Sequence, residues 1–453
     1  MTIIHIGSRD GGDGAGRAAY RLHCGLRGLL QDSRMLVAER RTQDPGVMRA
    51  NLSRSWGARV ERNFRRLEVQ WSASRYLSSK PAGTTFFSDD RTEYASGLVP
   101  QLPDCDVVNL HSVAGLVDYP TFFPALPPRL PLVWTLHDPN PFTGGCHNHG
   151  ACPGCRHECG HCPVLGSTQE KDLSRAIWRR KKRAYSYIPE GRLHVVAPSR
   201  WLAAECRQSV LLGRFPVSVI PNGLDTTDFR PRDRAVAREV LGIKRDSKVV
   251  MFVAGNIGDP NKGLSLLLEA LAPSPANGGI HLLSVGRGSD FPGVRLPRTN
   301  VGFIEGDRVL SWIYSAADIY VTPTLMDNLP NIVMESMSCG TPVIGFEVGG
   351  VPEMVHDGVS GFLVPKGDVA GLRQAILRVL NNPTLRAEMS ENCRRIAVQV
   401  YDEKVQARRY LALYESVLGI DPWGDDSNLH VNAGHGDSRE SMVDSPQSTV
   451  VEV

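Results

Sequence analysis

The chain has 453 residues, 42% of them hydrophobic and 22% charged, and a formal net charge of +3 at pH 7. This length is too great for one hydrophobic core, so two domains are expected. The composition is that of an ordinary globular protein, and so small a net charge argues against nucleic acid as the main partner.

The N-terminal residues MTIIHIGSRDGG lack a basic start followed by a long apolar run, and so predict a first core strand rather than a signal peptide. The sequence contains no run of eighteen apolar residues, so a membrane-spanning helix is not expected. We therefore expect a cytoplasmic protein, whose ten cysteines are thiols or metal ligands rather than disulfides.

Short apolar strands alternate with helices in the first half of the chain. Strands are predicted at 2–7, 33–38, 107–110, 132–136 and 194–197. A glycine-rich turn at 11–16 precedes a helix at 18–30, and Ser199 is suited to cap a helix that begins at Arg200. This alternation predicts a parallel sheet with helices on both faces.

Two positions near the ends of these strands suggest a ligand cleft. Gly12 and Gly14 allow the backbone to approach a ligand, although a tight strand–helix turn also uses glycine and the third glycine of a dinucleotide fingerprint is missing. His137 and Asp138 follow a strand at the edge where cleft residues gather in open α/β sheets. A structural histidine that caps the strand is the alternative.

Five cysteines fall within residues 146–162, interleaved with histidines. Cys159 and Cys162 have the spacing of half a tetrahedral zinc site, which Cys146 and Cys152 can complete. A rival set pairs Cys152 and Cys155 with Cys159 and Cys162, and free thiols or an iron–sulfur cluster remain alternatives. A closed four-thiolate site would be structural, and would hold a loop that has little core.

Two basic stretches, residues 54–77 and 175–185, interleave arginine with large apolar residues. Helices of this kind rest on anionic membrane surfaces. The alternative is a solvated helix that packs its apolar stripe on the domain.

The second half repeats the alternation after a break at 219–230, where proline and glycine interrupt the pattern. Strands are predicted at 248–255, 281–286, 319–322, 342–346 and 361–364, and helices at 264–271, 307–316, 331–338 and 369–380. A last helix is predicted at 402–418. After Trp423 the chain is polar, which predicts a disordered tail.

The segment NIGDPNKG, residues 256–263, lies between a predicted strand and a predicted helix. Lys262 would then sit at the cleft mouth, where an ammonium can neutralise charge on a departing diphosphate. A solvated surface lysine is the alternative.

Residues 325–365 are the most informative part of the chain. Asp327 and Glu335 lie across a loop-to-helix junction, with Asn328 as a plausible cap and Pro330 suited to the first turn. Free amide groups at the helix start can hold an anion, while the carboxylates hold hydroxyl groups. A sugar joined to a diphosphate presents both.

This stretch resembles the donor-binding signature of retaining glycosyltransferases of family 4, which is Glu, seven residues, Glu, then Ala-x-x-x-Gly-x-Pro-Val. Glu335, Gly340, Pro342 and Val343 match. Asp327 replaces the first Glu, and Ser336 stands where Ala is usual. The resemblance implies the α/β fold named GT-B, in which two Rossmann-like domains with parallel sheets face each other across a cleft.

The resemblance also implies a division of the chain. Residues 1–222 would form the acceptor-side domain, with a cysteine-rich insertion at 144–167, and residues 223–400 the nucleotide-sugar-binding domain. Residues 401–420 would form a helix that crosses back to the first domain, and 421–453 the disordered tail.

The resemblance implies transfer of a sugar from a nucleotide-diphosphate sugar to a glycan or lipid-linked acceptor, without a catalytic metal. His137, Lys262 and Asp327 would be catalytic, and Glu335 would bind the ribose. The other donor contacts would be Gly12, Gly14, Asn256, Leu329, Asn331 and Gly350. Asn256 stands where family members usually carry Arg.

The cysteine-rich segment looks like an insertion of some bacterial polysaccharide glycosyltransferases. That resemblance implies Cys146, Cys152, Cys159 and Cys162 as ligands of a structural zinc, and leaves Cys155 extra. Membrane contact through the two basic stretches would suit a lipid-linked acceptor and would place a cytoplasmic protein at the inner face of the cell membrane, whereas a soluble acceptor is the alternative.

Two other classes of function stay open. A sugar-nucleotide epimerase or a phosphorylase can share the GT-B fold. A zinc-dependent nucleic-acid-binding protein would explain the cysteines and the basic stretches, but not the donor signature.

Overall fold

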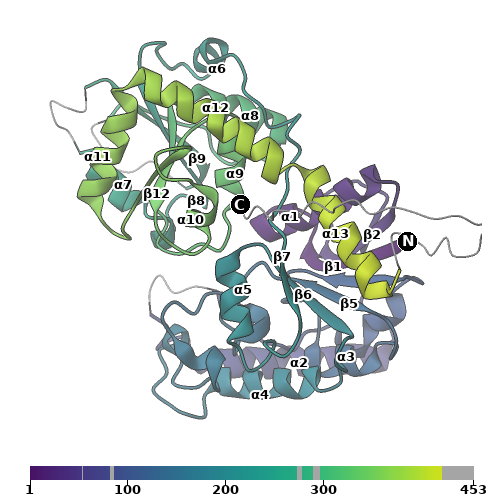
Figure 1. Ribbon diagram of the computed structural model, residues 1–453. Helices are drawn as coiled ribbons and strands as arrows, with labels where there is room; N and C mark the ends of the chain where they lie inside the picture. Colours follow the sequence, from purple (N-terminus) through teal and green to yellow (C-terminus); the bar gives the residue numbers. More distant parts are fainter. Residues whose placement is uncertain (54, 82–85, 273–277, 289–295, 421–453) are drawn as a thin grey trace, which may run out of the picture.

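The computed structural model describes residues 1–53, 55–81, 86–272, 278–288 and 296–420 (Figure 1). The predicted disordered tail, residues 421–453, lies outside the described residues. Two parallel β-sheets, each covered by helices, form the body of the molecule. Central strands such as Val107–Leu110, Leu132–Thr135 and Val343–Phe346 are buried along their whole length, as expected when both faces of a sheet are covered.

The first sheet, as far as the chain is described, has the strand order β3-β2-β1-β4-β5-β6-β7. Its strands are β1 (Thr2–Arg9), β2 (Asp32–Glu39), β3 (Val47–Arg49), β4 (Val107–Leu110), β5 (Leu132–Thr135), β6 (Leu193–Ala197) and β7 (Val217–Val219). All neighbouring strands are parallel. The order reverses between β1 and β4, and ligands of such sheets bind at that switch point.

The second sheet, within the described residues, has the order β10-β9-β8-β11-β12-β13. Its strands are β8 (Lys248–Asn256), β9 (Ile280–Arg287), β10 (Arg298–Asn300), β11 (Ile319–Thr322), β12 (Val343–Phe346) and β13 (Gly361–Val364). They are also parallel, and the order reverses between β8 and β11. The prediction of two Rossmann-like domains with parallel sheets is therefore confirmed.

The helices cover both sheets. In the first half they are α1 (Gly14–Gly28), α2 (Trp56–Ser74), α3 (Tyr119–Ala125), α4 (Leu173–Tyr185) and α5 (Arg200–Arg207). In the second half they are α6 (Arg234–Val240), α7 (Leu264–Ala270), α8 (Asp307–Ala316), α9 (Asn331–Ser338), α10 (Val351–Met354), α11 (Val369–Leu380), α12 (Pro383–Val400) and α13 (Glu403–Leu418). None of the helices within the described ranges is long and apolar enough to cross a membrane.

Helix α1 begins at Gly14, four residues earlier than predicted. The reason is Asp13, whose carboxylate accepts a hydrogen bond from the Gly16 amide at 2.7 Å and so caps the helix inside the glycine-rich turn. Small strands and helices such as β3, β10, α3 and α6 were not predicted, because their sequences are too short to show a period.

The chain passes between the two sheets twice, and the passages lie side by side. Leu224 exchanges backbone hydrogen bonds with Tyr401 and Glu403, each 2.9 Å long. Helix α13 then packs on α1 of the first domain, where Tyr414 accepts a 2.7 Å hydrogen bond from Asn109 (Figure 1).

Candidate active site

The candidate active site lies where the switch points of the two sheets face each other. The loops after β1 and β5 contribute from the first domain, and the loops after β8 and β11 from the second. Direct hydrogen bonds between Asn331 and Gly14, and between Asn328 and His137, join these loops.

Lys262 and Asp327 form an ion pair, with 2.7 Å between Nζ and Oδ2. Lys262 ends a short 3-10 turn (Pro260–Lys262), after which Gly263 takes a left-handed conformation with φ +72°. A Cβ on Gly263 would lie 1.9 Å from the Pro323 carbonyl oxygen, so glycine is needed for the turn to pack against the end of β11. The Asp327 carboxylate raises the pKa of Lys262, which therefore keeps its charge.

Gly350 packs directly against the Asp327 loop. A Cβ on Gly350 would lie 2.0 Å from the Asn328 carbonyl oxygen, and one on Gly349 would lie 1.7 Å from the Asp327 carbonyl oxygen. These close approaches hold the Asp327 loop in place, a structural role that the sequence analysis did not assign to either glycine.

Asn328 does not cap α9, so that prediction is wrong. The residue before α9 is Pro330, which makes no side-chain cap hydrogen bond. The Asn328 amide instead crosses to the first domain, where it donates to the His137 carbonyl at 3.1 Å and accepts from the Ser199 hydroxyl at 2.8 Å. Asn328 thus positions the Asp327 loop against the first domain.

His137 is the outermost member of a row of three histidines. Its Nε2 lies 3.1 Å from Nδ1 of His111, whose Nε2 lies 2.9 Å from Nδ1 of His5. Burial lowers the pKa of His137 to about 4, so the ring is neutral near pH 7. His137, His111 and Asp138 line a common pocket.

Two helix N-termini meet in the site. Helix α1 starts at Gly14 and α9 starts at Asn331, and the Asn331 amide donates a 2.8 Å hydrogen bond to the Gly14 carbonyl. Asn331 also accepts a 3.0 Å hydrogen bond from Asn222. The positive dipole ends of both helices therefore face the same region, which favours an anion there.

The remaining predicted donor contacts lie around this region. Gly12 takes a left-handed conformation, with φ +81°, ahead of α1. Leu329 is buried against the core of the second domain. Asn256 ends β8 and accepts a 3.0 Å hydrogen bond from the Gly258 amide, so its side chain shapes the loop that leads to Lys262.

Both oxygens of the buried Glu335 carboxylate are engaged in this structure. Oε1 accepts from the Arg21 guanidinium at 2.9 Å, and Oε2 accepts from the Tyr314 hydroxyl at 3.0 Å. Arg21 also pairs with Asp307 at 3.1 Å, and Arg17 with Asp307 at 3.3 Å. The predicted ribose ligand is therefore part of an ion-pair network between the two domains.

Arg17 and Arg21 were not predicted as site residues. Their spacing of four positions places them on one face of α1, directly after the glycine-rich turn, which is a signal that could have found them. What the sequence lacked was their acidic partners, which lie about 300 positions further along the chain.

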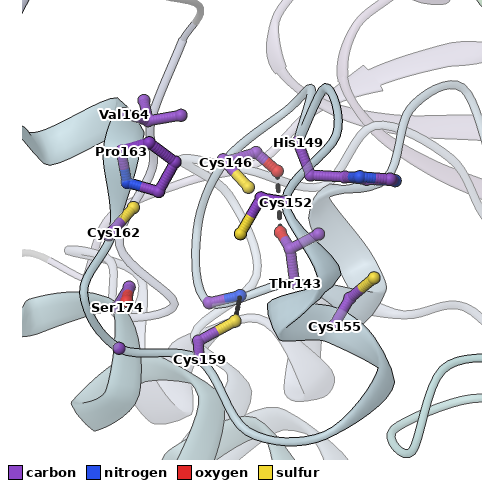
Figure 2. A pocket seen from close by; sticks show the side chains of 12 residues that line it. Thr143, Cys146, His149, Cys152, Cys155, Cys159, Cys162, Pro163, Val164 and Ser174 are labelled. Atoms are coloured by element: carbon purple, nitrogen blue, oxygen red, sulfur yellow. Dashed lines mark hydrogen bonds between the residues drawn. The ribbon is translucent and has the colours of Figure 1, made fainter. Parts of the chain in front are cut away.

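The four predicted zinc ligands line one cavity (Figure 2). Cys159 accepts a hydrogen bond from the Gly144 amide, with 3.2 Å between N and Sγ. Burial raises the pKa of Cys159 to about 12, so a bound cation would be needed to hold it as a thiolate. Among the described residues, no three of these four thiols have sulfur atoms within 4.8 Å of one another.

Cys155, the extra cysteine, points away from the other four sulfur atoms (Figure 2). Its sulfur, with ligand atoms of His149 and Glu205, forms a group whose members all lie within 4.8 Å of one another. The tightest set of candidate ligand atoms among the described residues is thus one that the sequence did not predict.

The two basic stretches differ in how they pack. Helix α4 buries Ile177 and Trp178, as a packing helix does. Helix α2 has no buried residue, and its large apolar side chains are 63–81% exposed: Trp56, Phe64, Leu67 and Trp71. The alternative of a packed apolar stripe therefore applies to α4 and is wrong for α2.

Similarity to solved structures agrees with this architecture. Sucrose-phosphate synthase from Thermosynechococcus elongatus matches with a TM-score of 0.61 and 19% identity, over 93% of this chain and 100% of that one. HepE of Anabaena, solved in complex with UDP and glucose, matches with a TM-score of 0.61 and 18% identity, over 92% of this chain and 100% of that one. The chain has the GT-B fold.

Sequence comparison concerns mainly the second domain. Residues 247–382, which lie in that domain, are similar to the family described as Glycosyl transferases group 1. A D-inositol 3-phosphate glycosyltransferase of Saccharomonospora viridis is 31% identical over 231 residues, which are 44% of this chain and 53% of the relative. A phosphatidyl-myo-inositol mannosyltransferase of Mycobacterium leprae is 33% identical over 208 residues, which are 44% of this chain and 53% of the relative. The chain thus spans about half the length of these curated relatives.

Proposed function

We propose that the protein is a retaining glycosyltransferase that moves a sugar from a nucleotide-diphosphate sugar to a glycan or lipid-linked acceptor in bacterial polysaccharide biosynthesis. The observation that carries this proposal is the meeting of two helix N-termini, at Gly14 and Asn331, in a site that also holds the Lys262–Asp327 pair. The group 1 match and the GT-B fold support it.

The reaction breaks the bond between the anomeric carbon and the diphosphate oxygen and forms one from that carbon to an acceptor hydroxyl. The acceptor proton passes to the departing phosphate on the same face of the sugar, which retains the configuration. Lys262 and the amides at the start of α9 stabilise the charge that develops on the diphosphate. No protein nucleophile and no catalytic metal are required.

Asp327 and His137 position the sugar. Asp327 is held by Lys262 at 2.7 Å and by the glycine-packed loop, so a donor hydroxyl meets a carboxylate already oriented. His137 is neutral and half-buried, so it offers a hydrogen bond without adding a positive charge next to an oxocarbenium-like sugar.

Glu335 binds the ribose by exchanging one partner. Tyr314 keeps its hydrogen bond to Oε2, while Arg21 releases Oε1 to the ribose hydroxyls and stays paired with Asp307. Donor binding then weakens one ion pair between the domains, which couples binding to the angle between them.

A panel of nucleotide sugars in a thermal-shift assay, followed by product analysis, tests the function. The preferred donor raises the melting temperature with the logarithm of its concentration. NMR of the product then shows the same anomeric configuration as the donor. An epimerase would change the donor without an acceptor, and a phosphorylase would need inorganic phosphate; either result would displace the proposal.

The cysteine-rich insertion holds a structural zinc through Cys146, Cys152, Cys159 and Cys162 in this proposal. Four thiolates around Zn²⁺ carry a net charge of −2, and Lys181 is a buried cation near Cys146 and Cys159. Its Nζ donates to the Asn140 carbonyl at 2.5 Å, which fixes the ammonium behind the cavity. The charge of Lys181 offsets part of the charge of the thiolates.

Helix α2 is the proposed contact with an anionic membrane at the inner face of the cell. Its exposed Trp56, Phe64, Leu67 and Trp71 share one helical face, and arginines flank that face. Binding to vesicles that contain phosphatidylglycerol tests this. Loss of binding in Phe64→Ser with Trp71→Ser is expected, whereas Val240→Ser, an exposed position on α6, keeps it.

A further inference from the structure

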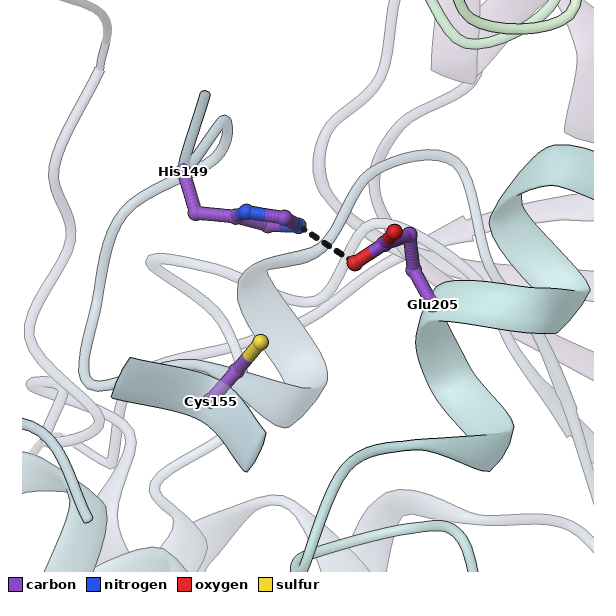
Figure 3. Close-up of side chains that lie close together, drawn as sticks. All are labelled: His149, Cys155 and Glu205. Carbon is purple, nitrogen blue, oxygen red and sulfur yellow. Dashed lines mark ion pairs between the residues drawn. The ribbon is translucent and has the colours of Figure 1, made fainter. Parts of the chain in front are cut away.

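Three side chains bring metal-ligand atoms together at one side of the four-thiol cavity, which His149 and Cys155 also line. His149 comes from the insertion, Cys155 from a 3-10 turn (Pro153–Arg156), and Glu205 from α5 (Figure 3). One ligand atom of each lies within 4.8 Å of the other two. None of the three belongs to the four-cysteine set.

The polar atoms of this group are buried without hydrogen-bond partners. Both ring nitrogens of His149 and Oε2 of Glu205 are buried and have no hydrogen-bond partner. The His149 side chain is only 7% exposed, and its Nε2 lies 3.3 Å from Glu205 Oε2 without hydrogen-bond geometry. Buried polar groups are nearly always satisfied, so this arrangement calls for a missing partner that all three side chains can share.

We propose that His149, Cys155 and Glu205 bind a second divalent metal ion of the zinc class, distinct from the ion of the four-cysteine site. A nitrogen, a sulfur and an oxygen donor suit a borderline-soft ion such as Zn²⁺. Tetrahedral zinc ligands lie about 3.5 Å apart, so small side-chain rotations would close the group around an ion. One thiolate and one carboxylate balance the two positive charges, and water completes the fourth position.

The surroundings of Glu205 fit a metal ligand. Its other oxygen, Oε1, accepts from the Arg156 guanidinium at 3.3 Å, so Arg156 orients the carboxylate from outside the site. Arg156 follows Cys155 directly in the chain, and the two residues thus approach Glu205 together.

The second ion fastens the insertion to α5. The first turn of α5 also contacts the second domain, because the Arg200 and Trp201 amides donate to the Glu353 carboxylate at 2.7 and 2.8 Å. The ion therefore connects the loop at 149–155 with the helix that meets the second domain, and it stabilises the native state by its own binding free energy.

Metal content of the purified full chain, measured by mass spectrometry after expression with zinc, tests this inference. The wild type is expected to hold two ions per chain, and Cys155→Ser and His149→Gln one each. The double variant Cys159→Ser with Cys162→Ser keeps the ion at His149. Cys105→Ser, at a half-buried cysteine far from the insertion in sequence, is the matched control and keeps both.

The outcomes separate this inference from the four-cysteine proposal. A wild type with one ion that Cys155→Ser removes and the double variant retains would support the second site and refute the first. Metal content unchanged by Cys155→Ser would overturn the inference. If Cys155→Ser fails to fold, Glu205→Gln replaces it, and its zinc affinity is expected to fall at least ~10-fold; unchanged affinity would overturn the inference.

Cobalt substitution gives a second readout. In the Cys159→Ser, Cys162→Ser background, the Co²⁺-loaded protein should show a thiolate-to-cobalt absorption band that disappears when Cys155→Ser is added. A band that persists in the triple variant contradicts the assignment of Cys155.

Discussion

Arg21 of α1 and Glu335 of α9 are joined by a hydrogen bond of 2.9 Å between Nη2 and Oε1, across the boundary of the two domains. Both side chains are almost fully buried, so the pair is held away from water, where its loss is costly. The same carboxylate is the proposed ribose ligand. The pair therefore links the relative position of the domains to the occupation of the donor site.

Glu335→Gln should weaken donor binding while the fold is kept, because a neutral amide replaces the charged acceptor for the ribose hydroxyls. Loss of one charge-assisted hydrogen bond corresponds to about 1.5–3 kcal/mol, or roughly a 10- to 100-fold rise in Kd. Titration calorimetry with the preferred nucleotide sugar measures this. Glu239→Gln, at an exposed carboxylate that pairs with Arg245 at 4.0 Å, is the matched control and should leave Kd unchanged. Equal effects of the two variants would contradict the role of Glu335.

Lys262→Ala should lower turnover by about 3 kcal/mol or more, which is at least a 100-fold reduction in kcat, because no other charge would face the leaving diphosphate in the same position. Steady-state kinetics with donor and acceptor checks this. Lys248→Ala is the matched control, because this half-buried lysine starts β8 and donates to Asn381 at 2.7 Å, and its loss should leave kcat unchanged. Turnover close to that of the wild type in Lys262→Ala would remove Lys262 from the site.

Gly350→Ala should disturb the Asp327 loop, because its Cβ would lie 2.0 Å from the Asn328 carbonyl oxygen. We expect a loss of stability of about 1–3 kcal/mol together with weaker donor binding. Urea denaturation and donor titration measure the two effects. Gly255→Ala is the matched control, since a Cβ there meets no atom within 4 Å. A Gly350→Ala protein as stable and as active as the control would refute this packing argument.

The histidine row should make the protein sensitive to acid. Burial lowers the pKa of His137 to about 4 and holds the pKa of His111 well below its ordinary 6.5. Between these values and 6.5 the unfolded chain binds protons that the folded chain does not. The stabilisation that these histidines contribute is therefore fully present above about pH 6.5 and is lost as the pH falls toward 4. Each such group contributes up to about 1.4 kcal/mol per pH unit.

Urea denaturation at pH 7.5 and pH 5.0 measures this loss, and His111→Asn should reduce it. The comparison with a variant is needed because the raised pKa of Glu403, about 7, acts in the opposite direction and lowers stability as the pH rises from 4.5 to 7. The same pH dependence in the variant and the wild type would show that folding does not lower the pKa of His111.

Removal of the proposed structural zinc should loosen the insertion before it abolishes chemistry. A chelator, or Cys159→Ser with Cys162→Ser, should raise hydrogen exchange at residues 144–167 several-fold while the sheets stay protected. Hydrogen-exchange mass spectrometry locates the change. The same exchange in the insertion with and without the metal would argue that the thiols are free.

Local sequence patterns were sufficient for the parts of the fold in which one segment specifies its own structure. The apolar run Val107–Leu110 predicts a buried strand because every residue of a covered parallel strand faces apolar neighbours. Lys262 and Asp327 were both predicted to lie in the cleft, but their ion pair was not predicted, because the two residues are 65 positions apart. The start of α1 was misjudged, because one side chain, Asp13, decides where the helix begins.

The sequence by itself determined the alternation of strands and helices, the two domains and the residue types that suit a sugar diphosphate, since these depend on local periodicity and on the chemistry of single side chains. Only the tertiary structure decided that Asn328 binds His137 instead of capping α9, and that Arg21 forms an ion pair with Glu335. It also decided that Cys155 lies close to His149 and Glu205. Such contacts join positions up to 314 residues apart, and which distant groups meet is set by how the two domains pack, a property that no short segment contains.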